Sequence, residues 1–201
     1  KTGQGFYKKE KHEDGSSEIK SLDLNTLDYR AKKSAKFSTL EKTKSVDIVA
    51  DRFPILVDGK DKAGEFYRKN FAALFAYVQN RIPEITDALY KIDDAMKAGF
   101  GWQHGPFQIW DAIGLEKGIQ LMKDEGYEIA DWIQALSESK EKSFYHVKSG
   151  KTYFYDIDKK EHAKIPGQDA FIILDNIRES HEVFSNKDLV AEDLGDGILN
   201  I

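Results

Sequence analysis

The amino-acid sequence predicts a mainly α-helical protein that also carries small β-hairpins. Apolar residues recur at helical spacing over residues 61–98, which places them on one face of a helix. Glycine and proline then divide residues 99–138 into shorter helical segments. Two stretches with alternating strand patterns, 1–24 and 143–156, surround Asp-Gly and Ser-Gly turns. Helices and short hairpins therefore account for most of the chain.

The composition excludes several classes of protein. The chain of 201 residues carries a formal net charge of −5, whereas a protein that binds the phosphate backbone of nucleic acid is usually basic. It contains no cysteine, which excludes a disulfide framework and a thiolate metal site. No apolar run approaches the roughly 20 residues that span a bilayer, and no signal peptide is visible. We therefore expect a cytoplasmic protein with no nucleic-acid partner and no membrane insertion.

Both ends of the sequence resemble the interior of a protein. The chain starts at Lys1, without an initiator methionine, in what reads as structured sequence. It stops where Asp196 and Gly197 predict a turn and Ile198 and Leu199 predict the start of a strand. Native termini are usually polar and frayed. We therefore expect a fragment of a longer polypeptide.

The first 60 residues predict a hairpin and a linker. Residues 1–24 form two strands around a turn at Asp14 and Gly15. Residues 25–60 are mixed, polar and rich in lysine. We expect this segment to be a linker that lies along a surface, with one short helical piece that Pro54 closes.

Two helices follow, and Pro83 separates them. The apolar stripe of the first helix consists of Phe71, Leu74, Phe75, Val78 and Ile82. The stripe of the second helix consists of Ile85, Ala88, Leu89, Ile92 and Met96. Gly99 is placed as the C-terminal cap of the second helix. Pro106 then starts a short helix that closes at Gly114.

Residues 99–114, with the sequence GFGWQHGPFQIWDAIG, predict a structural corner between two helices. Gly101 and Gly105 allow a tight backbone there, and Phe107 and Trp110 enter the core. The structural motif of this corner consists of Gly99, Phe100, Gly101, Gly105, Pro106, Phe107, Trp110, Asp111 and Gly114.

No residue of the chain is predicted to be catalytic or to bind a metal. His104 lies in the corner, where a histidine could act as a general acid, a general base or a ligand. No carboxylate stands at a recognisable catalytic spacing from it, so we interpret His104 as a loop histidine beside two helix ends. The five histidines form neither an H-x3-H nor an H-E-x-x-H pattern, which argues against a metal site.

Two further patterns indicate a structural role and not a catalytic or binding role. Asp93 and Asp94 are adjacent on a helix and point in different directions, which predicts two solvated carboxylates and not a dyad. The glycine-rich stretches 2–6 and 99–105 do not follow a strand and open a helix, as a phosphate-binding loop must. We therefore expect no cofactor-binding residue in this chain.

We interpret the two hairpins as the ends of two copies of one repeat, in which helices precede a hairpin. Residues 1–24 and 143–156 share a Phe-Tyr opening, a glycine turn and a closing alternating strand. We expect the first copy to be truncated, with its helices in a part of the polypeptide that precedes Lys1. The second copy covers residues 61–165, including its closing hairpin. Residues 166–201 add one helix, over 170–180, and a tail.

Two motifs resemble a known family. The sequence KTGQGFYKK, residues 1–9, is similar to the K-T-G-x-G-F-Y signature that closes the C-terminal domain of 3-hydroxyacyl-CoA dehydrogenases. The sequence IDDAMKAGFGWQHGPFQIWDAIGL, residues 92–115, resembles the pattern I-D-x-A-(M/L)-x-x-G-F-G-x-x-x-G-P-F-x-x-x-D-x-x-G of the same domain. The tail 189–201 resembles the start of a crotonase-like enoyl-CoA hydratase domain. This order is similar to the tandem C-terminal repeats of long, fused β-oxidation enzymes.

The resemblance implies a parent enzyme that oxidises L-3-hydroxyacyl-CoA with NAD in fatty-acid β-oxidation. A Rossmann-type domain, absent here, would bind NAD and supply the catalytic His-Glu pair. The fold implied for this chain is the helical C-terminal type, like that of 6-phosphogluconate dehydrogenase. Its implied partners are the acyl-CoA substrate, through the parent enzyme, and the missing NAD-binding and hydratase domains.

The resemblance also gives residues 61–165 a role. In fused relatives the second repeat takes the place of a partner subunit, so these residues would form an apolar platform that holds the first repeat and the acyl-CoA cleft in shape. A homo-oligomer stays open. Two alternatives remain: an independent interaction or dimerisation module without catalysis, and a small hydrolase that uses His104.

Overall fold

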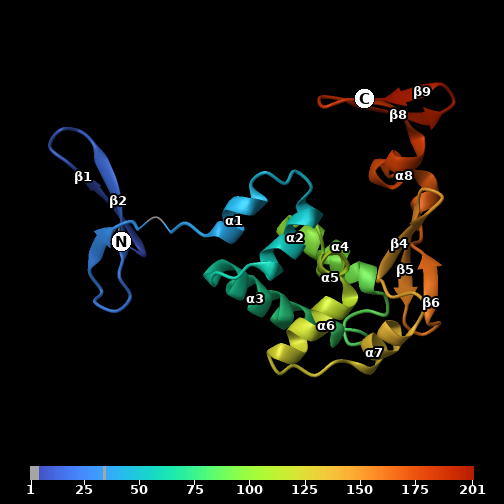
Figure 1. Ribbon diagram of the computed structural model, residues 1–201, viewed down its shortest axis with the longest axis horizontal. Coiled ribbons are helices and arrows are strands. Elements are labelled where there is room, and N and C mark those ends of the chain that lie inside the picture. Colours follow the sequence, from blue (N-terminus) through green and yellow to red (C-terminus); the bar gives the residue numbers. More distant parts are fainter. Residues whose placement is uncertain (1–4, 34) are drawn as a thin grey trace. The chain divides into compact units, whose positions relative to one another are not determined.

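The computed structural model describes residues 5–33 and 35–201, and the chain divides into two compact units between Phe37 and Ser38. The first unit contains a three-stranded antiparallel sheet in the order β1-β2-β3 (Figure 1). Its strands are β1 (Tyr7–Lys11), β2 (Ser17–Leu22) and β3 (Tyr29–Ala31). The first four residues of the signature KTGQGFYKK lie outside the described residues.

Strands β1 and β2 form the hairpin that the sequence predicts. Gly15 has a φ angle of +83° in its turn, and the backbone N–H of Ser16 donates to the carboxylate of Asp14 at 2.9 Å. The third strand, β3, is an addition to the prediction. An ion pair of 2.9 Å between Asp23 and Arg30 holds the loop that returns β3 to the sheet.

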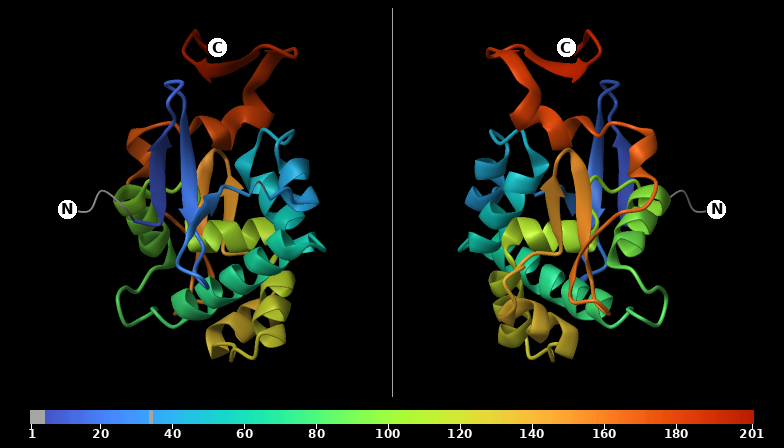
Figure 2. Two further views of the ribbon diagram at one scale, coloured as in Figure 1. Left: turned by 90° about the vertical axis from the view of Figure 1, so that its left-hand side faces the viewer. Right: turned by 90° about the vertical axis from the view of Figure 1, so that its right-hand side faces the viewer.

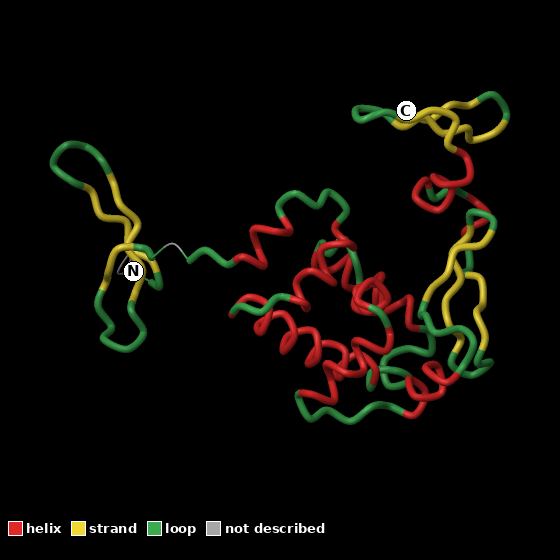
Figure 3. The backbone as a smooth tube through the Cα atoms, viewed as in Figure 1, coloured by secondary structure: helices red, strands yellow, loops and turns green. Residues whose placement is uncertain are grey.

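The second unit has a helical body (Figure 3). Its helices are α1 (Ser38–Thr43), α2 (Val49–Asp58), α3 (Lys62–Gln79), α4 (Leu89–Phe100), α5 (Pro106–Ile113), α6 (Leu115–Asp124) and α7 (Asp131–Glu138). The largest fully buried apolar side chains of its core are Phe75, Leu89, Phe107, Trp110, Met122, Ile133, Leu136, Phe144 and Tyr155. Burying apolar surface of this kind supplies most of the free energy of folding.

The segment 25–60 differs from the expected linker because it contains β3, α1 and α2. Pro54 lies inside α2 and does not close it. Proline cannot donate a helical hydrogen bond, yet the helix continues because Leu56 and Val57 are buried in the body. Packing of the apolar face therefore outweighs the local cost of the proline.

The carboxylate of Asp61 connects two helices. It caps the N-terminus of α3 by accepting hydrogen bonds of 3.1 Å from the backbone N–H groups of Ala63 and Gly64. It also accepts bonds of 3.0 and 2.8 Å from the backbone and hydroxyl of Thr39 at the start of α1. One side chain therefore fixes α1 against α3.

The two predicted helices around Pro83 are shorter than their apolar stripes. The first, α3, ends at Gln79, and α4 does not begin until Leu89. Ile85 precedes α4 and its side chain is 68% exposed. The cap of α4 is Gly101 and not Gly99, because Gly101 has the left-handed φ of +67° and its N–H donates to the carbonyl of Lys97 at 3.1 Å.

A second antiparallel sheet follows the helices, in the order β4-β5-β6. Its strands are β4 (Tyr145–Lys148), β5 (Lys151–Asp156) and β6 (Glu161–Lys164), and they lie side by side in both views of Figure 2. Ser149 and Gly150 form the predicted turn, with φ angles of +50° and +70°. Strand β6 is an addition to the predicted hairpin and gives this sheet the same strand order as the sheet of the first unit.

The remaining residues form a short helical turn, a helix and a third antiparallel sheet. The elements are η1 (Gln168–Ala170), α8 (Leu174–His181), β7 (Glu182–Ser185), β8 (Val190–Gly195) and β9 (Ile198–Asn200). The predicted helix over 170–180 therefore starts four residues later than expected, at Leu174. Within the described part of the chain, every helix is too short or too polar to span a bilayer.

Candidate functional site: a carboxylate corner and an apolar groove

The corner predicted over residues 99–114 joins α4 to α5. Gly99 and Phe100 belong to the last turn of α4, where the Phe100 side chain is 74% exposed. Pro106 is the first residue of α5, and Gly114 follows its last residue. The boundaries of α5 therefore coincide with the predicted helix, because proline suits a first helical turn and Gly114 has a φ of +100°.

The buried carboxylate of Asp93 hydrogen-bonds to the backbone of this corner. Asp93 comes from α4, is only 1% exposed and accepts hydrogen bonds of 2.9 and 3.0 Å from the backbone N–H groups of Phe107 and Gln108. These are unpaired donors of the first turn of α5, so a side chain of one helix caps the next. A Cβ atom at Gly105 would overlap the side chain of Asp93. Glycine at 105 therefore serves close approach, and not an unusual φ angle.

The expectation of two solvated carboxylates at 93 and 94 is wrong for Asp93. Asp94 is exposed and pairs with Lys97 at 3.0 Å. Adjacent helix positions do point in different directions, as expected, but one of these directions leads into the core. Helical spacing alone does not reveal that Asp93 is buried, because the residue lies beside the apolar stripe and not in it. Its burial depends on the backbone N–H groups at the N-terminus of α5.

Asp111 connects the corner to the second sheet. Its two carboxylate oxygens accept hydrogen bonds of 2.8 Å from the backbone N–H groups of Phe144 and Tyr145, where β4 begins. Burial raises the pKa of Asp111 to about 7, although both hydrogen bonds act in the opposite direction. Burial likewise raises the pKa of Asp93 to about 6. Asp111 belongs to the predicted corner motif, but its partners lie more than 30 positions away and have no signal in the sequence.

The aromatic residues of the corner are fully buried. Phe107 and Trp110 have no exposed surface, and the ring of Trp110 stacks on Phe75 with 4.6 Å between centroids. The indole N–H of Trp110 donates to the carbonyl of Leu115 at 3.1 Å. Gly118 lies so close to this indole that a Cβ atom there would overlap it.

His104, in the loop between α4 and α5, lines a cavity of the second unit. Its ring meets the edge of Phe53 with 5.7 Å between centroids, and burial lowers its pKa. The cavity has a volume of about 950 Å³ and brings His104 near Asp175 and Asn176 of α8. The negative charge of Asp175 opposes the lowering of the His104 pKa. The sequence analysis did not find this carboxylate because 71 positions separate the two residues.

An open apolar groove runs beside the corner. It has a volume of about 780 Å³ and is lined by α3, α4, the segment between them and Pro106. Tyr77 and Ile85 present 59% and 68% of their surface to solvent there. Arg81 stands in the groove with its guanidinium 4.7 Å from the ring centroid of Tyr77 and 2.7 Å from Glu84. Within the described residues, the Nε of Arg81 is buried and has no hydrogen-bond partner.

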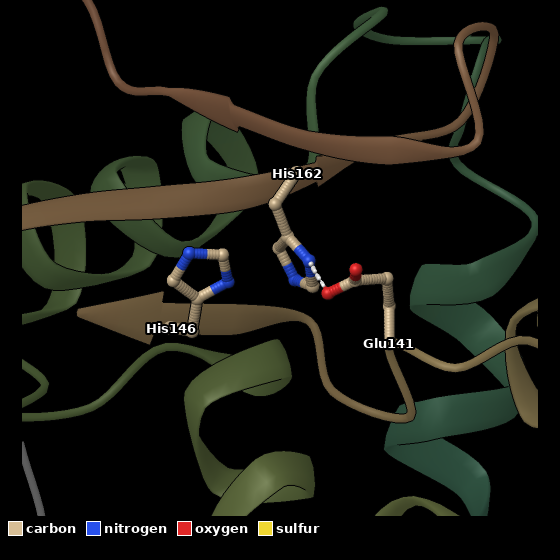
Figure 4. Close-up of side chains that lie close together, drawn as sticks. All are labelled: Glu141, His146 and His162. Carbon is tan, nitrogen blue, oxygen red and sulfur yellow. Dashed lines mark hydrogen bonds and ion pairs between the residues drawn. The ribbon is translucent and has the colours of Figure 1, made fainter. Parts of the chain in front are cut away.

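Three side chains of types that can bind a metal ion lie close together at the second sheet. Glu141 comes from the loop after α7, His146 from β4 and His162 from β6 (Figure 4). Their ligand atoms all lie within 4.8 Å of one another. Spacing patterns in the sequence did not find the cluster because three separate elements supply its members.

The comparisons with known proteins agree with the resemblance seen in the motifs. Residues 71–155 match the family described as 3-hydroxyacyl-CoA dehydrogenase, C-terminal domain. Over 98% of its length the chain is 32% identical to a "Probable 3-hydroxyacyl-CoA dehydrogenase" from Bacillus subtilis (strain 168), of which it covers 24%. Over 53% of its length it is 26% identical to a "Putative fatty acid oxidation complex trifunctional enzyme" from Rickettsia felis, of which it covers 13%.

A similarly named protein from Rickettsia prowazekii is 29% identical over 38% of the chain and is covered to 11%. The chain thus spans about a quarter or less of the length of the curated relatives it matches. No solved structure matches the chain significantly. Residues 71–155 are thus similar to the C-terminal domain of 3-hydroxyacyl-CoA dehydrogenases, and the chain as a whole is similar to part of a longer protein that bears this name.

Proposed function

We propose that this chain is a helical C-terminal portion of an NAD-dependent 3-hydroxyacyl-CoA dehydrogenase of fatty-acid β-oxidation. In this role it shapes the acyl-CoA cleft and the pairing of domains, while other parts of the enzyme bind NAD and carry the catalytic residues. The matched segment, 71–155, contains the second half of α3, the corner and the strands β4 and most of β5, which supports the proposal. The proposed setting is the cytoplasm.

The observation that carries the proposal is the apolar groove between α3 and α4. Its exposed Tyr77 and Ile85 lie on the helical body. Hydrogen bonds of Asp93 and Asp111 connect α4, α5 and the second sheet within this unit. An apolar surface on a rigid support is suited to a partner helix, because burial of apolar area contributes about 25 cal/mol per Å². We assign this groove to the first helical repeat of the same enzyme, which in turn borders the acyl-CoA cleft.

The hydratase domain is a second proposed partner. The Rickettsia relatives are named as trifunctional enzymes of a fatty acid oxidation complex, which supports a polypeptide with several activities. The resemblance of residues 189–201 to the start of a crotonase-like domain points the same way. In such a polypeptide this chain would connect the dehydrogenase part to the hydratase part.

The test uses the dehydrogenase polypeptide that contains this segment and measures NADH oxidation with acetoacetyl-CoA. Ile85→Asp places a charge in the groove at a side chain that is 68% exposed, so the fold itself loses little. Val183→Asp is the matched control, because Val183 is 60% exposed and lies on β7, away from the groove. We expect kcat/KM to fall by about tenfold or more in Ile85→Asp, which corresponds to about 1.4 kcal/mol.

An unchanged kcat/KM in Ile85→Asp would contradict the assignment of the groove. The same exposed groove also favours one alternative, an independent dimerisation module. That alternative requires the chain alone to form a dimer that Ile85→Asp dissociates. Light scattering of the chain, with and without the remaining dehydrogenase polypeptide, distinguishes the two, because the first repeat should displace a dimer partner from the groove.

A further inference from the structure

The cluster of Glu141, His146 and His162 arises from the alternation of the second sheet. In the register of the sheet, His146 lies opposite Tyr153 and His162 lies opposite Tyr155. Paired residues share a face of the sheet and residues two apart do so as well, so both histidines and both tyrosines lie on one face. The loop after α7 brings Glu141 over this face, as Figure 4 shows.

The three side chains converge at contact distance. The imidazole rings of His146 and His162 have centroids 4.4 Å apart, and Nδ1 of His162 lies 2.6 Å from Oε2 of Glu141. The ring of His146 stacks on Tyr153 with 5.1 Å between centroids, which fixes its plane. Two imidazoles and one carboxylate are a ligand set of catalytic zinc sites, with bonds of about 2.0–2.2 Å. The three side chains would have to shift to reach such distances from one ion, because their ligand atoms now lie within 4.8 Å of one another.

The second nitrogen of His162 determines how its ring is held. Nε2 lies 3.0 Å from the backbone carbonyl of Ser143, which accepts hydrogen bonds only, so Nε2 carries a proton. The side chain is 3% exposed. A histidine that binds a metal usually donates its other N–H to a carbonyl or carboxylate in this way, which directs the free nitrogen at the ion.

The sheet of the first unit shows what His162 adds. Tyr29 occupies the position in that sheet that His162 occupies in the second sheet. In each sheet, the residue that follows this position pairs with a residue of the middle strand, which pairs in turn with the tyrosine of the Phe-Tyr opening. The hydroxyl of Tyr29 donates to the carbonyl of Gly5 at 2.6 Å, the counterpart of the contact between His162 and Ser143. A tyrosine therefore satisfies the carbonyl alone, and the histidine supplies a second nitrogen that faces a carboxylate.

We propose that Glu141, His146 and His162 bind a divalent transition-metal ion of the zinc class. The ion takes the place of the proton between Nδ1 of His162 and Glu141, and water completes the tetrahedral coordination on the exposed side of Glu141. The site lies away from the groove and joins the loop after α7 to strands β4 and β6. The bound ion would hold the loop after α7 to this sheet and keep one coordination position open to water, and the proposal does not depend on the proposed dehydrogenase role.

The experiment is titration of the metal-free chain with Zn²⁺ by calorimetry, and with Co²⁺ by visible absorption. We expect one Zn²⁺ per chain, an increase in Tm on binding that EDTA reverses, and the absorption of tetrahedral Co²⁺. His162→Tyr is the key variant, because it keeps a donor for the Ser143 carbonyl, as Tyr29 does for Gly5, and removes the ligand nitrogen. Its affinity for Zn²⁺ should fall by more than about tenfold while its circular dichroism stays unchanged.

His146→Ala and Glu141→Gln should weaken binding in the same way. His12→Ala is the matched control, because His12 is an exposed histidine of the first unit. Failure of the wild-type chain to bind Zn²⁺ or Co²⁺ would overturn the proposal. Binding that His162→Tyr and His146→Ala both retain would also overturn it, because the ion would then lie elsewhere on the chain.

Discussion

The hydroxyl of Tyr145 donates a hydrogen bond of 2.9 Å to the carboxylate of Asp93, although 52 positions separate the two residues. Tyr145 begins β4, and Asp93 lies on α4 beneath the first turn of α5. The backbone N–H of Tyr145 also donates to Asp111 on α5. One tyrosine therefore joins both buried carboxylates, and through them the sheet, the corner and two helices form one connected network.

Tyr145→Phe should destabilise the second unit. The substitution removes the hydroxyl but leaves the ring, so Asp93 loses a donor in a buried environment. A hydrogen bond to a charged group contributes about 1.5–3 kcal/mol to the free energy of unfolding. Urea denaturation measures the loss, and Tyr127→Phe is the control because Tyr127 is 41% exposed. A loss for Tyr145→Phe no larger than for this control would contradict the network.

Two glycines of the corner should respond differently to alanine. Gly105→Ala drives a methyl group into Asp93, and overpacking of this kind costs about 1–3 kcal/mol. Gly99→Ala meets open space inside α4, where alanine is favoured over glycine by about 0.5–1 kcal/mol. Thermal unfolding of the two variants should therefore shift Tm in opposite directions. Equal Tm shifts in the two variants would contradict the close approach of Gly105 to Asp93.

The stability of the second unit should fall as the pH rises from about 4 to about 7. Burial raises the pKa of Asp111 to about 7 and that of Asp93 to about 6, from an ordinary value of 3.8. The folded protein thus holds protons that the unfolded chain has released, so their contribution is full below the unfolded pKa and is lost as the pH rises through the folded values. At pH values above the folded-state pKa values, each unit by which a pKa is raised lowers the free energy of unfolding by about 1.4 kcal/mol.

Asp111→Asn tests this dependence because asparagine does not titrate. Urea denaturation at pH values of about 5 and 8 should show a smaller difference between the two conditions in this variant than in the wild type. Asp94→Asn, at an exposed carboxylate that pairs with Lys97, should keep the wild-type difference. If Asp111→Asn shows the same difference in stability between pH values of about 5 and 8 as the wild type, the carboxyl of Asp111 is ionised at both pH values, and the prediction is wrong.

Pro54→Ala should stabilise α2. The proline lies in the interior of this helix, where it leaves the carbonyl four residues earlier without its helical donor. Alanine restores that N–H and removes the ring, and the gain exceeds the added entropy of the unfolded chain, which is about 0.4–1 kcal/mol. We expect a net increase of about 1–2 kcal/mol in the free energy of unfolding. A lower stability would indicate that the proline ring packs favourably against α1.

The local elements follow from short-range features of the amino-acid sequence. Pro106 and Gly114 delimit α5 because proline suits a first helical turn and glycine accepts a positive φ angle. Ser149 and Gly150 determine the hairpin of the second sheet in the same local way. The stripe of Phe71, Phe75 and Val78 identifies the buried face of α3. Each of these signals lies within a few neighbouring residues, so a single sequence contains it.

The partners of the buried polar residues, by contrast, depend on tertiary packing. Asp93 and Asp94 are alike in sequence, and Asp93 is buried only because the first turn of α5 offers unpaired N–H groups at its position. Glu141, His146 and His162 meet because strand register and a loop bring three elements to one face. The α2 helix passes through Pro54 because its far end packs into the core. Such partners are distant along the chain, and their burial and pairing free energies exist only once the elements have packed.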